Sequence, residues 1–462
     1  MKRCVSLFAL PLAVTLGPTA AQASNDVAYF MSGDAALVSG AVAASTEDSG
    51  AVWYNPAGLG NIRRQQVDLM TTVALVESRR IPAGMVTTLP DGQSRITLDE
   101  SRLDVPMPST IYVRRIGGLT LGGGIFISQD EDAHLAGGQT AGGDTSYSMV
   151  RANVDVVTQR YHLGVATGFE VSRSVRLGFG LFGVYQDEQH VQDLGLAYID
   201  AATGEQVAVQ YEWREASERL GVEATAGLQV DATDALALGL VVRSPIWLLS
   251  ESVDAFELFT LGMVVPNEQG APQSVVFGGV VPEPRAAAGR GLWEPLRVVG
   301  SLAYDFGPVT TLAELSHAPR LRSLEVELEG GPETRYLVDR RAVTNFRFGA
   351  LVRASKTVEV GWGAYTDRSP QREPEPGTVD VDYVGVTGGV RLTEPVKLAR
   401  SERADHLLFR TTVAARYGFG QGQATQVNAV VDGSEDIDLT FDRHVDVTFH
   451  ELHLLIGAGV LF

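Results

Sequence analysis

Long segments in which apolar and polar residues alternate one by one are the feature that most limits how this chain can fold. From Leu220 to Val230 every second residue is Leu, Val or Ala, and Gly, Glu, Thr and Gln stand between them. A period of two places the two sets on opposite faces of a β-strand. The pattern recurs from Tyr161, Phe346 and Phe409. The sequence therefore predicts an all-β protein in which each strand has one apolar face.

Alternation alone fits a soluble sandwich or a membrane barrel, and three features favour the barrel. The segments run for about nine or more residues, which suits tilted transmembrane strands, whereas soluble strands centre on about five or six. Short connections such as 173–174 alternate with long polar ones such as 186–206, as in a barrel with one loop-rich end. Aromatic residues near segment ends fit girdles at the membrane surfaces: Tyr185, Trp213, Trp247, Trp362 and Tyr417.

The last alternating segment predicts how the barrel closes. It covers 452–462 and ends on the aromatic residue Phe462, as the closing strands of outer-membrane barrels characteristically do. The segments number roughly thirteen to sixteen, and single-chain bacterial barrels use even numbers of strands. We therefore predict a transmembrane antiparallel β-barrel of about 14 strands.

The first residues have the pattern of a secretory signal peptide. Lys2 and Arg3 precede an apolar run and a small-residue site at Ala23, where we expect cleavage. The chain's single cysteine, Cys4, would leave with this leader, which excludes disulfides and thiolate sites from the mature protein. Without Lys2 and Arg3 the formal charge is 35 − 56 = −21. This argues against nucleic acid as a partner, because nucleic acid requires a basic face.

The sequence gives little support for an enzyme. Residues 178–183 match GxGxxG, but the residues around them alternate as a strand and not as a strand, turn and helix. His450 and His453 lack the helical spacing of a zinc motif, and no GxSxG is present. A barrel enzyme would need a Ser or His cluster at the membrane rim, which we cannot locate. We predict no enzymatic activity, no metal site and no cofactor.

Charged residues recur on the strand faces that we assign to the lumen. An arginine facing lipid near the midplane would cost about 2 to 4 kcal/mol, so these side chains should point inward. Two interpretations stay open: the charges pair with one another and brace a polar lumen, or some arginines bind the carboxylate of an amphipathic ligand. The candidates for carboxylate binding are Arg160, Arg347, Arg410 and Arg416.

The N-terminal stretch resembles a known family. The small residues of 33–43, an acidic pair and the turn sequence of 53–59 are similar to the hatch of FadL-type outer-membrane transporters, which carry long-chain fatty acids and other hydrophobic compounds. The pair is Glu-Asp here, where that family more often has Asp-Asp. The alternative is a plain surface turn between two strands. The predicted hatch and gating residues are Glu47, Asp48, Asn55, Pro56, Ala57 and Gly58.

The resemblance implies three parts and a transport route. The parts are a signal peptide at 1–23, a hatch inside the lumen at 24–64, and a barrel at 65–462 with long extracellular loops. A ligand would enter at the loop-rich end and leave sideways beside the third strand, here about 119–128, without energy coupling. The residues expected at this lateral opening are Gly122, Gly123, Gly124 and Asp130. The glycines could equally serve only to fit a crowded strand against the hatch.

We therefore expect a monomeric channel in the bacterial outer membrane, in contact with its lipid and lipopolysaccharide. Its function would be passive uptake of hydrophobic or amphipathic small molecules, with long-chain fatty acids as the foremost class. The alternative is an outer-membrane barrel with a structural or secretion-associated role and no transported ligand. An apolar lumen site would favour transport, and a lumen packed solid with side chains would favour the structural role.

Overall fold

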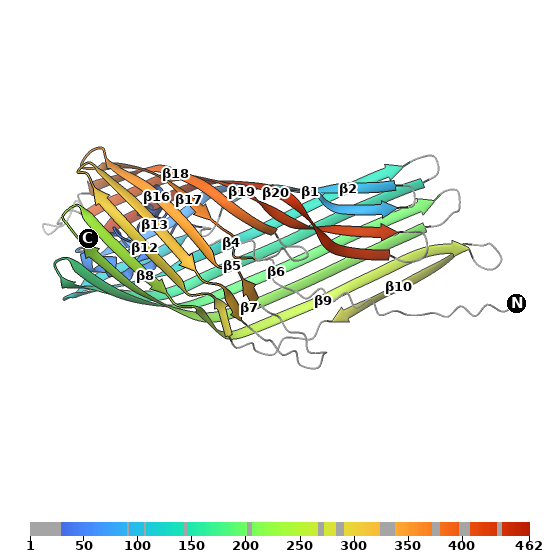
Figure 1. Ribbon diagram of the computed structural model, residues 1–462, viewed down its shortest axis with the longest axis horizontal. Helices are drawn as coiled ribbons and strands as arrows, with labels where there is room; N and C mark the ends of the chain where they lie inside the picture. The colour runs from blue at the N-terminus through green and yellow to red at the C-terminus, as the bar shows by residue number, and fades with distance from the viewer. Residues whose placement is uncertain are drawn as a thin grey trace.

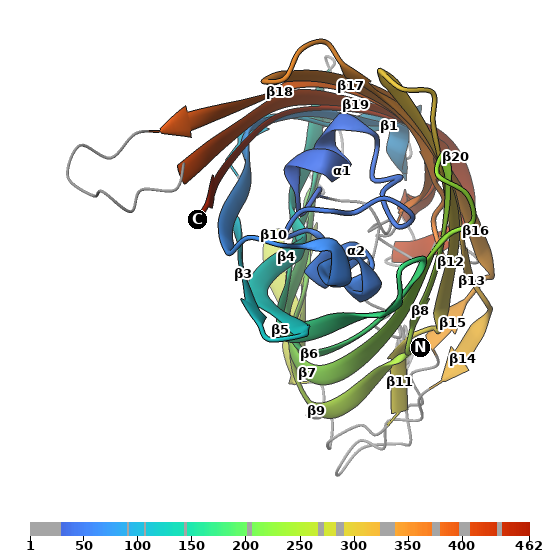
Figure 2. The same cartoon turned by 90° about the vertical axis from the view of Figure 1, so that its left-hand side faces the viewer.

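The computed structural model describes residues 29–89, 92–105, 108–142, 146–200, 206–266, 272–282, 291–323, 338–371, 379–396, 407–431 and 437–462. The predicted signal peptide and its cleavage site lie outside these residues. Three short helices come first: α1 (Gly33–Leu37), α2 (Ala51–Tyr54) and the 3-10 helix η1 (Pro56–Asn61). They lie inside a ring of strands, with α1 toward β18 and β19 and α2 toward β4 and β5 (Figure 2). None of the described helices is long and apolar enough to cross a membrane.

Strands make up nearly all of the remaining described chain. In order they are β1 (Gln66–Leu89), β2 (Gly92–Asp104), β3 (Ser109–Ile116), β4 (Leu119–Gly142), β5 (Ser146–Ser172), β6 (Val175–Asp200), β7 (Gln206–Asp231), β8 (Leu236–Arg243), β9 (Ile246–Pro266), β10 (Pro272–Pro282), β11 (Gly291–Glu294), β12 (Arg297–Asp305), β13 (Val309–Ala318), β14 (Leu321–Ser323), β15 (Val338–Arg340), β16 (Val343–Arg353), β17 (Val358–Asp367), β18 (Val379–Val396), β19 (Leu407–Val431) and β20 (Ile437–Leu461).

Fourteen of these strands close into an antiparallel barrel, as predicted. Around the ring their order is β1, β3, β4, β5, β6, β7, β8, β12, β13, β16, β17, β18, β19 and β20. The last strand then pairs with the first, with Gln66 opposite Leu461. The barrel therefore starts at Gln66 and ends one residue before Phe462.

The two ends of the barrel differ. At one end the strands meet in short turns, such as Arg173-Ser174 between β5 and β6. At the other end β4 to β7 continue well past the ring, with lengths of 24 to 27 residues. Here β2 pairs with β1, and β9 pairs with β7 on one edge and with β10 on the other. We call this the long end; Figure 1 shows it on the right and the short turns on the left.

In the ring, the apolar strand face points outward. On β6, Phe179 and Leu181 are 53% and 59% exposed, whereas the alternate residues Phe182 and Val184 are completely buried inside. A soluble sandwich would bury the apolar face, so this arrangement fits a wall surrounded by lipid. Exposed aromatic residues lie on the outer surface, as expected for girdles: Tyr185, Trp247, Trp362 and Tyr417.

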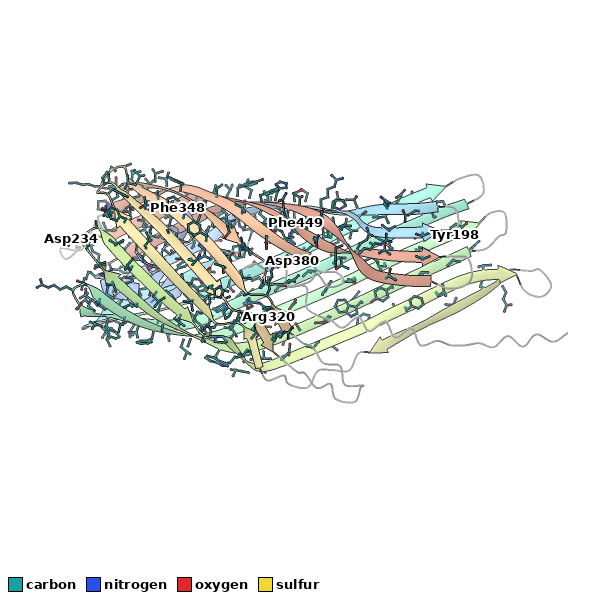
Figure 3. The ribbon with its side chains drawn as sticks, in the orientation of Figure 1. Tyr198, Asp234, Arg320, Phe348, Asp380 and Phe449 are labelled. Atoms are coloured by element: carbon teal, nitrogen blue, oxygen red, sulfur yellow. The ribbon has the colours of Figure 1, made fainter. Side chains whose placement is uncertain are left out.

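One predicted girdle residue is wrong. Trp213 is only 5% exposed and points inward on β7 at the long end. It belongs to an apolar cluster that lines the inside of that end, on the strands where Figure 3 labels Tyr198 and Phe449. At the short-turn end the same figure labels Asp234. The position of Trp213 near the end of an alternating segment gave no sign of which face it would occupy.

Candidate functional site

The turn that contains Asn55 is a buried joint and not a surface turn. The Asn55 side chain caps η1 by accepting a hydrogen bond from the Ala57 N–H at 3.1 Å. Its Nδ2 donates to the Ala43 carbonyl at 2.6 Å and to the Leu228 carbonyl on β7 at 3.2 Å. Pro56 takes the first helical position, where its missing N–H is not needed. One side chain thus joins two parts of the hatch to the barrel wall.

Glycines in the wall make room for this joint. A Cβ on Gly178 of β6 would lie 2.1 Å from the Pro56 carbonyl carbon, and one on Gly227 of β7 would lie 2.0 Å from Asn55 Oδ1. Gly168 on β5 has the same relation to the Pro56 carbonyl oxygen, at 2.4 Å. Three neighbouring strands therefore carry glycine where the hatch backbone touches them. Gly178, the first glycine of the GxGxxG match, serves this contact.

The two acidic hatch residues have different surroundings. Asp48 is buried and accepts a hydrogen bond from the Gly50 N–H at 2.9 Å, whereas Glu47 is exposed. Asp48 lies close enough to Asp68 of β1 and Arg410 of β19 for their charges to act on it. Of the predicted hatch residues, only Glu47 is therefore at the surface.

Charged residues fasten the hatch to the wall on the side of β13 to β19. Asp34 of α1 forms an ion pair with Arg391 of β18. The Ala43 N–H donates to Glu314 of β13 at 3.3 Å, and the same carboxylate pairs with Arg347 at 2.8 Å. On the opposite side, apolar side chains and the glycine contacts described above are joined by hydrogen bonds from Arg243 to the Trp53 carbonyl at 2.7 Å and from Arg176 to Asn61 at 2.8 Å.

The four candidate carboxylate-binding arginines do not form one site. Arg160 of β5 pairs with Glu294 at 3.0 Å and donates to Gln186 at 2.7 Å. The other three lie near the hatch on the opposite wall. There Arg347 binds Glu314, Arg416 donates to the Tyr365 hydroxyl at 2.6 Å, and Arg410 is near Asp48. All four have protein groups as neighbours, which matches the interpretation that lumen charges pair with one another.

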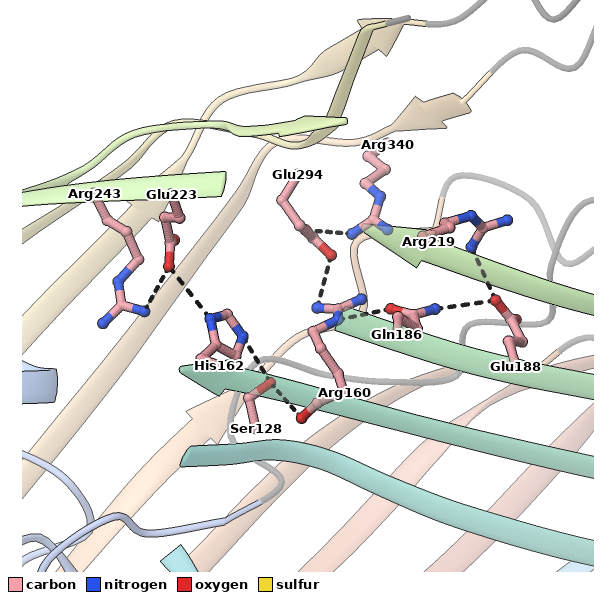
Figure 4. Close-up of polar contacts among 10 residues, drawn as sticks. All are labelled: Ser128, Arg160, His162, Gln186, Glu188, Arg219, Glu223, Arg243, Glu294 and Arg340. Carbon is pink, nitrogen blue, oxygen red and sulfur yellow. Dashed lines mark hydrogen bonds and ion pairs between the residues drawn. The ribbon is translucent and has the colours of Figure 1, made fainter. Parts of the chain in front are cut away.

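A band of paired polar side chains lies on β5 to β8, β11 and β15, between the hatch and the long end (Figure 4). Glu294 bridges Arg160 and Arg340, at 3.0 and 2.5 Å, and Glu188 pairs with Arg219 at 2.9 Å. Nearer the hatch, Glu223 pairs with Arg243 at 3.2 Å and lies 3.6 Å from His162. We call this band the polar belt: Arg160, His162, Gln186, Glu188, Arg219, Glu223, Arg243, Glu294 and Arg340.

Beyond the polar belt the lumen of the long end is apolar. We call this group the outer apolar cluster: Ile81, Met85, Ile96, Leu98, Leu135, Val150, Ala152, Leu194, Leu196, Tyr198, Val209, Tyr211, Trp213, Val379, Val381, Tyr383, Ala424, Val427, Ala429, Val447 and Phe449. His190 lies at its border, edge-on to Trp213 with ring centres 4.8 Å apart. Burial lowers the pKa of His190 to about 4, so this histidine is neutral at neutral pH. The sequence analysis missed the cluster.

The strand pairing of the barrel is interrupted beside β4. The β3–β4 pairing stops at Thr110 opposite Ile125, and β2 meets β4 only where Asp99 lies opposite Ala136. Between these points, residues 126–135 of β4 pair with β5 on one side, and no described strand pairs with them on the other. The β4–β5 register also shifts between Ile127 and Gln129. We call residues 126–135 of β4, with the facing residues 99–105 and 108–109, the interruption.

Side chains replace backbone pairing across the interruption. The Ile127 N–H donates to Ser109 Oγ at 3.3 Å, and the His134 N–H donates to Glu100 at 3.0 Å. The Tyr29 hydroxyl, from the N-terminal segment inside the lumen, donates to the Asp130 carbonyl at 2.7 Å. These contacts satisfy backbone groups that a neighbouring strand would otherwise bind.

Ion pairs also cross the interruption. Arg79 of β1 binds Glu77 at 3.1 Å and reaches Glu131 of β4 at 2.9 Å. Arg102 of β2 binds Asp132 of β4 at 2.9 Å and Asp104 at 2.8 Å. Within the described part of the chain, no three His, Cys, Asp or Glu side chains are arranged to hold a metal ion.

The residues predicted at the lateral opening lie in two different places. Gly122, Gly123 and Gly124 pair with β3 on one side and β5 on the other, just before the interruption. A Cβ on Gly122 would lie 2.3 Å from the Val52 side chain, so this glycine makes room for the hatch. Asp130 lies within the interruption and accepts the hydrogen bond from Tyr29.

Comparisons with known proteins agree on the architecture. No protein-family model and no curated protein sequence matches the chain. Among solved structures, it is similar to a Pseudomonas aeruginosa FadL homologue, with a TM-score of 0.61 and 10% identity over 94% of this chain and 99% of that one. The Ralstonia pickettii toluene transporter TbuX gives a TM-score of 0.50 and 13% identity, over 93% and 97%. A TodX variant described as a monoaromatic hydrocarbon channel gives 0.53 and 13%, over 93% and 98%.

Proposed function

We propose that this chain, which has the fold of the FadL-type outer-membrane channels, is itself an outer-membrane channel for passive uptake of hydrophobic or amphipathic small molecules. The observation that carries the proposal is the interruption beside β4, which adjoins the lumen. Such solutes are held back by the polar outer leaflet and not by the hydrocarbon layer. A side exit through the barrel wall would deliver them past that barrier.

The packing of the hatch supports a sideways exit over an axial one. Asn55 and the wall glycines hold η1 against β5 to β7, and the Asp34–Arg391 pair holds α1 on the opposite side. An axial path would require these contacts to break together. At the interruption, a handful of side-chain contacts separate the two walls; a neutral hydrogen bond typically contributes about 0.5–1.5 kcal/mol and one to a charged group about 1.5–3 kcal/mol. Opening there disturbs far less structure.

The lumen supports entry from the long end. The outer apolar cluster lies at the mouth, where its side chains are buried against one another, and the polar belt lies between it and the hatch. We place the long end outside the cell, in contact with lipopolysaccharide, and the short turns in the periplasm. The chain reaches the outer membrane after cleavage of its signal peptide near Ala23, and the channel acts as a monomer. Glu47, Asp48, Asn55, Pro56, Ala57 and Gly58 belong to the hatch that closes the axial path.

Two ligand classes come into question. Long-chain fatty acids are implied by the resemblance of the hatch sequence, and two of the similar structures are described as channels for toluene or monoaromatic hydrocarbons. The lumen arginines already have protein partners, so carboxylate binding by Arg160, Arg347, Arg410 or Arg416 would require exchange of those partners. The uptake experiment therefore includes one ligand of each class.

The test joins the two sides of the interruption by a reversible cross-link. Arg102→Cys and Asp132→Cys place thiols on its two sides, joined by a short cross-linker that a reductant cleaves. We expect the cross-link to abolish uptake of labelled oleate or toluene, and reductant to restore it. The control pair, Asp187→Cys and Glu218→Cys, lies opposite in the continuous β6–β7 pairing, and its cross-link should leave uptake unchanged. Unimpaired uptake in the cross-linked variant would overturn the lateral route. If the unmodified protein gave no more uptake than cells without it, the structural role would be favoured.

A further inference from the structure

We infer that the interruption selects ligands by charge: neutral and amine-bearing hydrophobic molecules pass, and carboxylates of the same shape are impeded. This inference rests on the proposed function and names its substrate class. The inference comes from the side chains at the interruption, which is the only break in the strand pairing of β4 among the described residues. It therefore separates the two ligand classes considered above.

Acidic side chains outnumber basic ones at the interruption. Arg79 is in contact with three glutamates, from β1, β2 and β4, and Arg102 is in contact with two aspartates. Asp130 lies on the same stretch of β4. The carboxylates in contact with Arg79 and Arg102 are Glu77, Glu100, Asp104, Glu131 and Asp132, and Asp130 adds a sixth. A passing molecule therefore meets a surplus of negative charge.

Glu100 shows where a ligand donor could bind. Its side chain is nine-tenths buried and reaches across the interruption, where Oε1 accepts the hydrogen bond from the His134 N–H. The second oxygen, Oε2, lies 4.0 Å from Arg79 Nε and has no hydrogen-bond partner among the described residues. A buried carboxylate oxygen without a partner accepts hydrogen bonds readily. It suits an ammonium or a hydroxyl group and repels a carboxylate.

The arginines do not offset this preference. Arg79 and Arg102 each bind more than one carboxylate of the protein, so a ligand carboxylate would have to displace one of them. Glu77, Arg79 and Glu100 are all buried, so water screens their charges weakly. Repulsion between like charges is therefore stronger here than on an exposed surface. The discrimination acts on the sign of the charge and not on polarity alone.

The experiment uses three molecules of similar shape that differ in charge. Labelled phenylacetate, 2-phenylethanol and 2-phenylethylamine are supplied at neutral pH to cells that lack general porins, with and without the full-length protein. We expect protein-dependent uptake of phenylacetate to be slower than that of 2-phenylethanol by on the order of tenfold. Uptake of the amine should be much closer to that of the alcohol than to that of the acid.

Isosteric neutralisation locates the effect. Glu100→Gln keeps an oxygen for the His134 N–H, and Asp132→Asn leaves Arg102 bound to Asp104. In this double variant we expect the alcohol-to-acid ratio to fall to about threefold. The control is Glu218→Gln with Asp254→Asn, which removes the same charge from exposed positions on β7 and β9. Its ratio should equal that of the unchanged protein.

Each outcome bears on one claim. Equal uptake of acid and alcohol, or equal slowing of acid and amine, overturns selection by charge while the proposed channel function stands. An unchanged ratio in the Glu100→Gln, Asp132→Asn variant overturns the assignment to the interruption, provided that its heat-modifiable band shows a folded barrel. If none of the three compounds shows protein-dependent uptake, while oleate and toluene also show none, the proposed function itself fails.

Discussion

The two halves of strand β6 carry their apolar residues on opposite faces of the strand. Near the short turns, its odd-numbered residues Phe179 and Leu181 are apolar and exposed on the outside. At the long end, its even-numbered residues Leu194 and Leu196 are apolar and only 6% exposed on the inside. The β6–β7 pairing runs without a register shift from Val175 to Ile199. The apolar face therefore changes sides while the strand itself does not turn over.

The neighbouring strand β7 makes the same change. Leu220 is exposed on the outer surface of the ring, whereas Tyr211 and Trp213 point into the lumen of the long end. In the proposed channel, lipid surrounds the first region and water the second, so the outward face is apolar in one and polar in the other. The polar belt lies where the two regions meet. The surroundings of a strand, and not its geometry, therefore decide which face carries the apolar residues.

The largest expected effect comes from an arginine placed on the outer surface of each half of β6. Leu181→Arg places a charge on the lipid-facing surface and should destabilise the folded barrel by about 2–4 kcal/mol if it lies near the midplane. The matched change, Gln189→Arg, puts the same side chain on the outward face of β6 at the long end and should change stability by less than about 0.5 kcal/mol. Urea unfolding in lipid vesicles measures both. Equal losses would show that lipid surrounds both regions.

A somewhat smaller effect tests the inner surface of the long end. Leu196→Ala removes apolar contacts from the outer apolar cluster and should cost about 2 kcal/mol of unfolding free energy. Gln210→Ala, on the exposed face of β7, serves as its control and should be nearly neutral. The same unfolding measurement applies. If both variants behaved alike, the cluster would contribute nothing to stability and its apolar character would belong to ligand capture alone.

The smallest effect is a pH dependence at the border of the two halves. The pKa of an unfolded histidine is about 6.5, and burial lowers the pKa of His190 to about 4. The unfolded chain therefore binds the extra proton between these values, and the stability that this group contributes is complete above about pH 6.5 and declines toward pH 4. At pH 5.5 the loss should be about 1 kcal/mol.

The variant His190→Gln should lack this part of the acid sensitivity, and His444→Gln, at an exposed position, should keep it. Unfolding free energies at pH 7.5 and pH 5.5 give the comparison. Equal acid sensitivity in all three proteins would mean that His190 is not buried in the folded barrel in the way that its packing on Trp213 indicates.

Much of the architecture could be predicted from local patterns. Alternation with a period of two over long segments predicted the strands. Asn55 and Pro56 predicted an ordered turn because each restricts its own backbone. The structure adds that this turn is buried and that Asn55 binds the β7 backbone. These features depend on neighbours in the chain, so one sequence contains enough information for them.

Other features could not be read in this way. The girdle prediction for Trp213 is wrong because a position near the end of a segment does not reveal that the apolar face has changed sides. The change of apolar residues on β6 from odd to even numbers was the available signal, and it needs to be read along the whole strand. Gly122 to Gly124 were proposed for the opening, but the contact that explains Gly122 comes from Val52, far away in the chain.

The sequence by itself determined that the chain forms long strands, that one face of each is apolar, and that an ordered turn lies at Asn55 and Pro56; the hatch was implied by the resemblance to a known family. The strands and the turn follow from residue spacing and from the backbone limits of Asn, Pro and Gly. Only the tertiary structure decided where the apolar face changes sides, which arginines are paired, and where pairing beside β4 stops. Each of these depends on which distant segments meet. The pairing between residues 99–110 and 125–136 cannot be predicted from the residues of either segment alone.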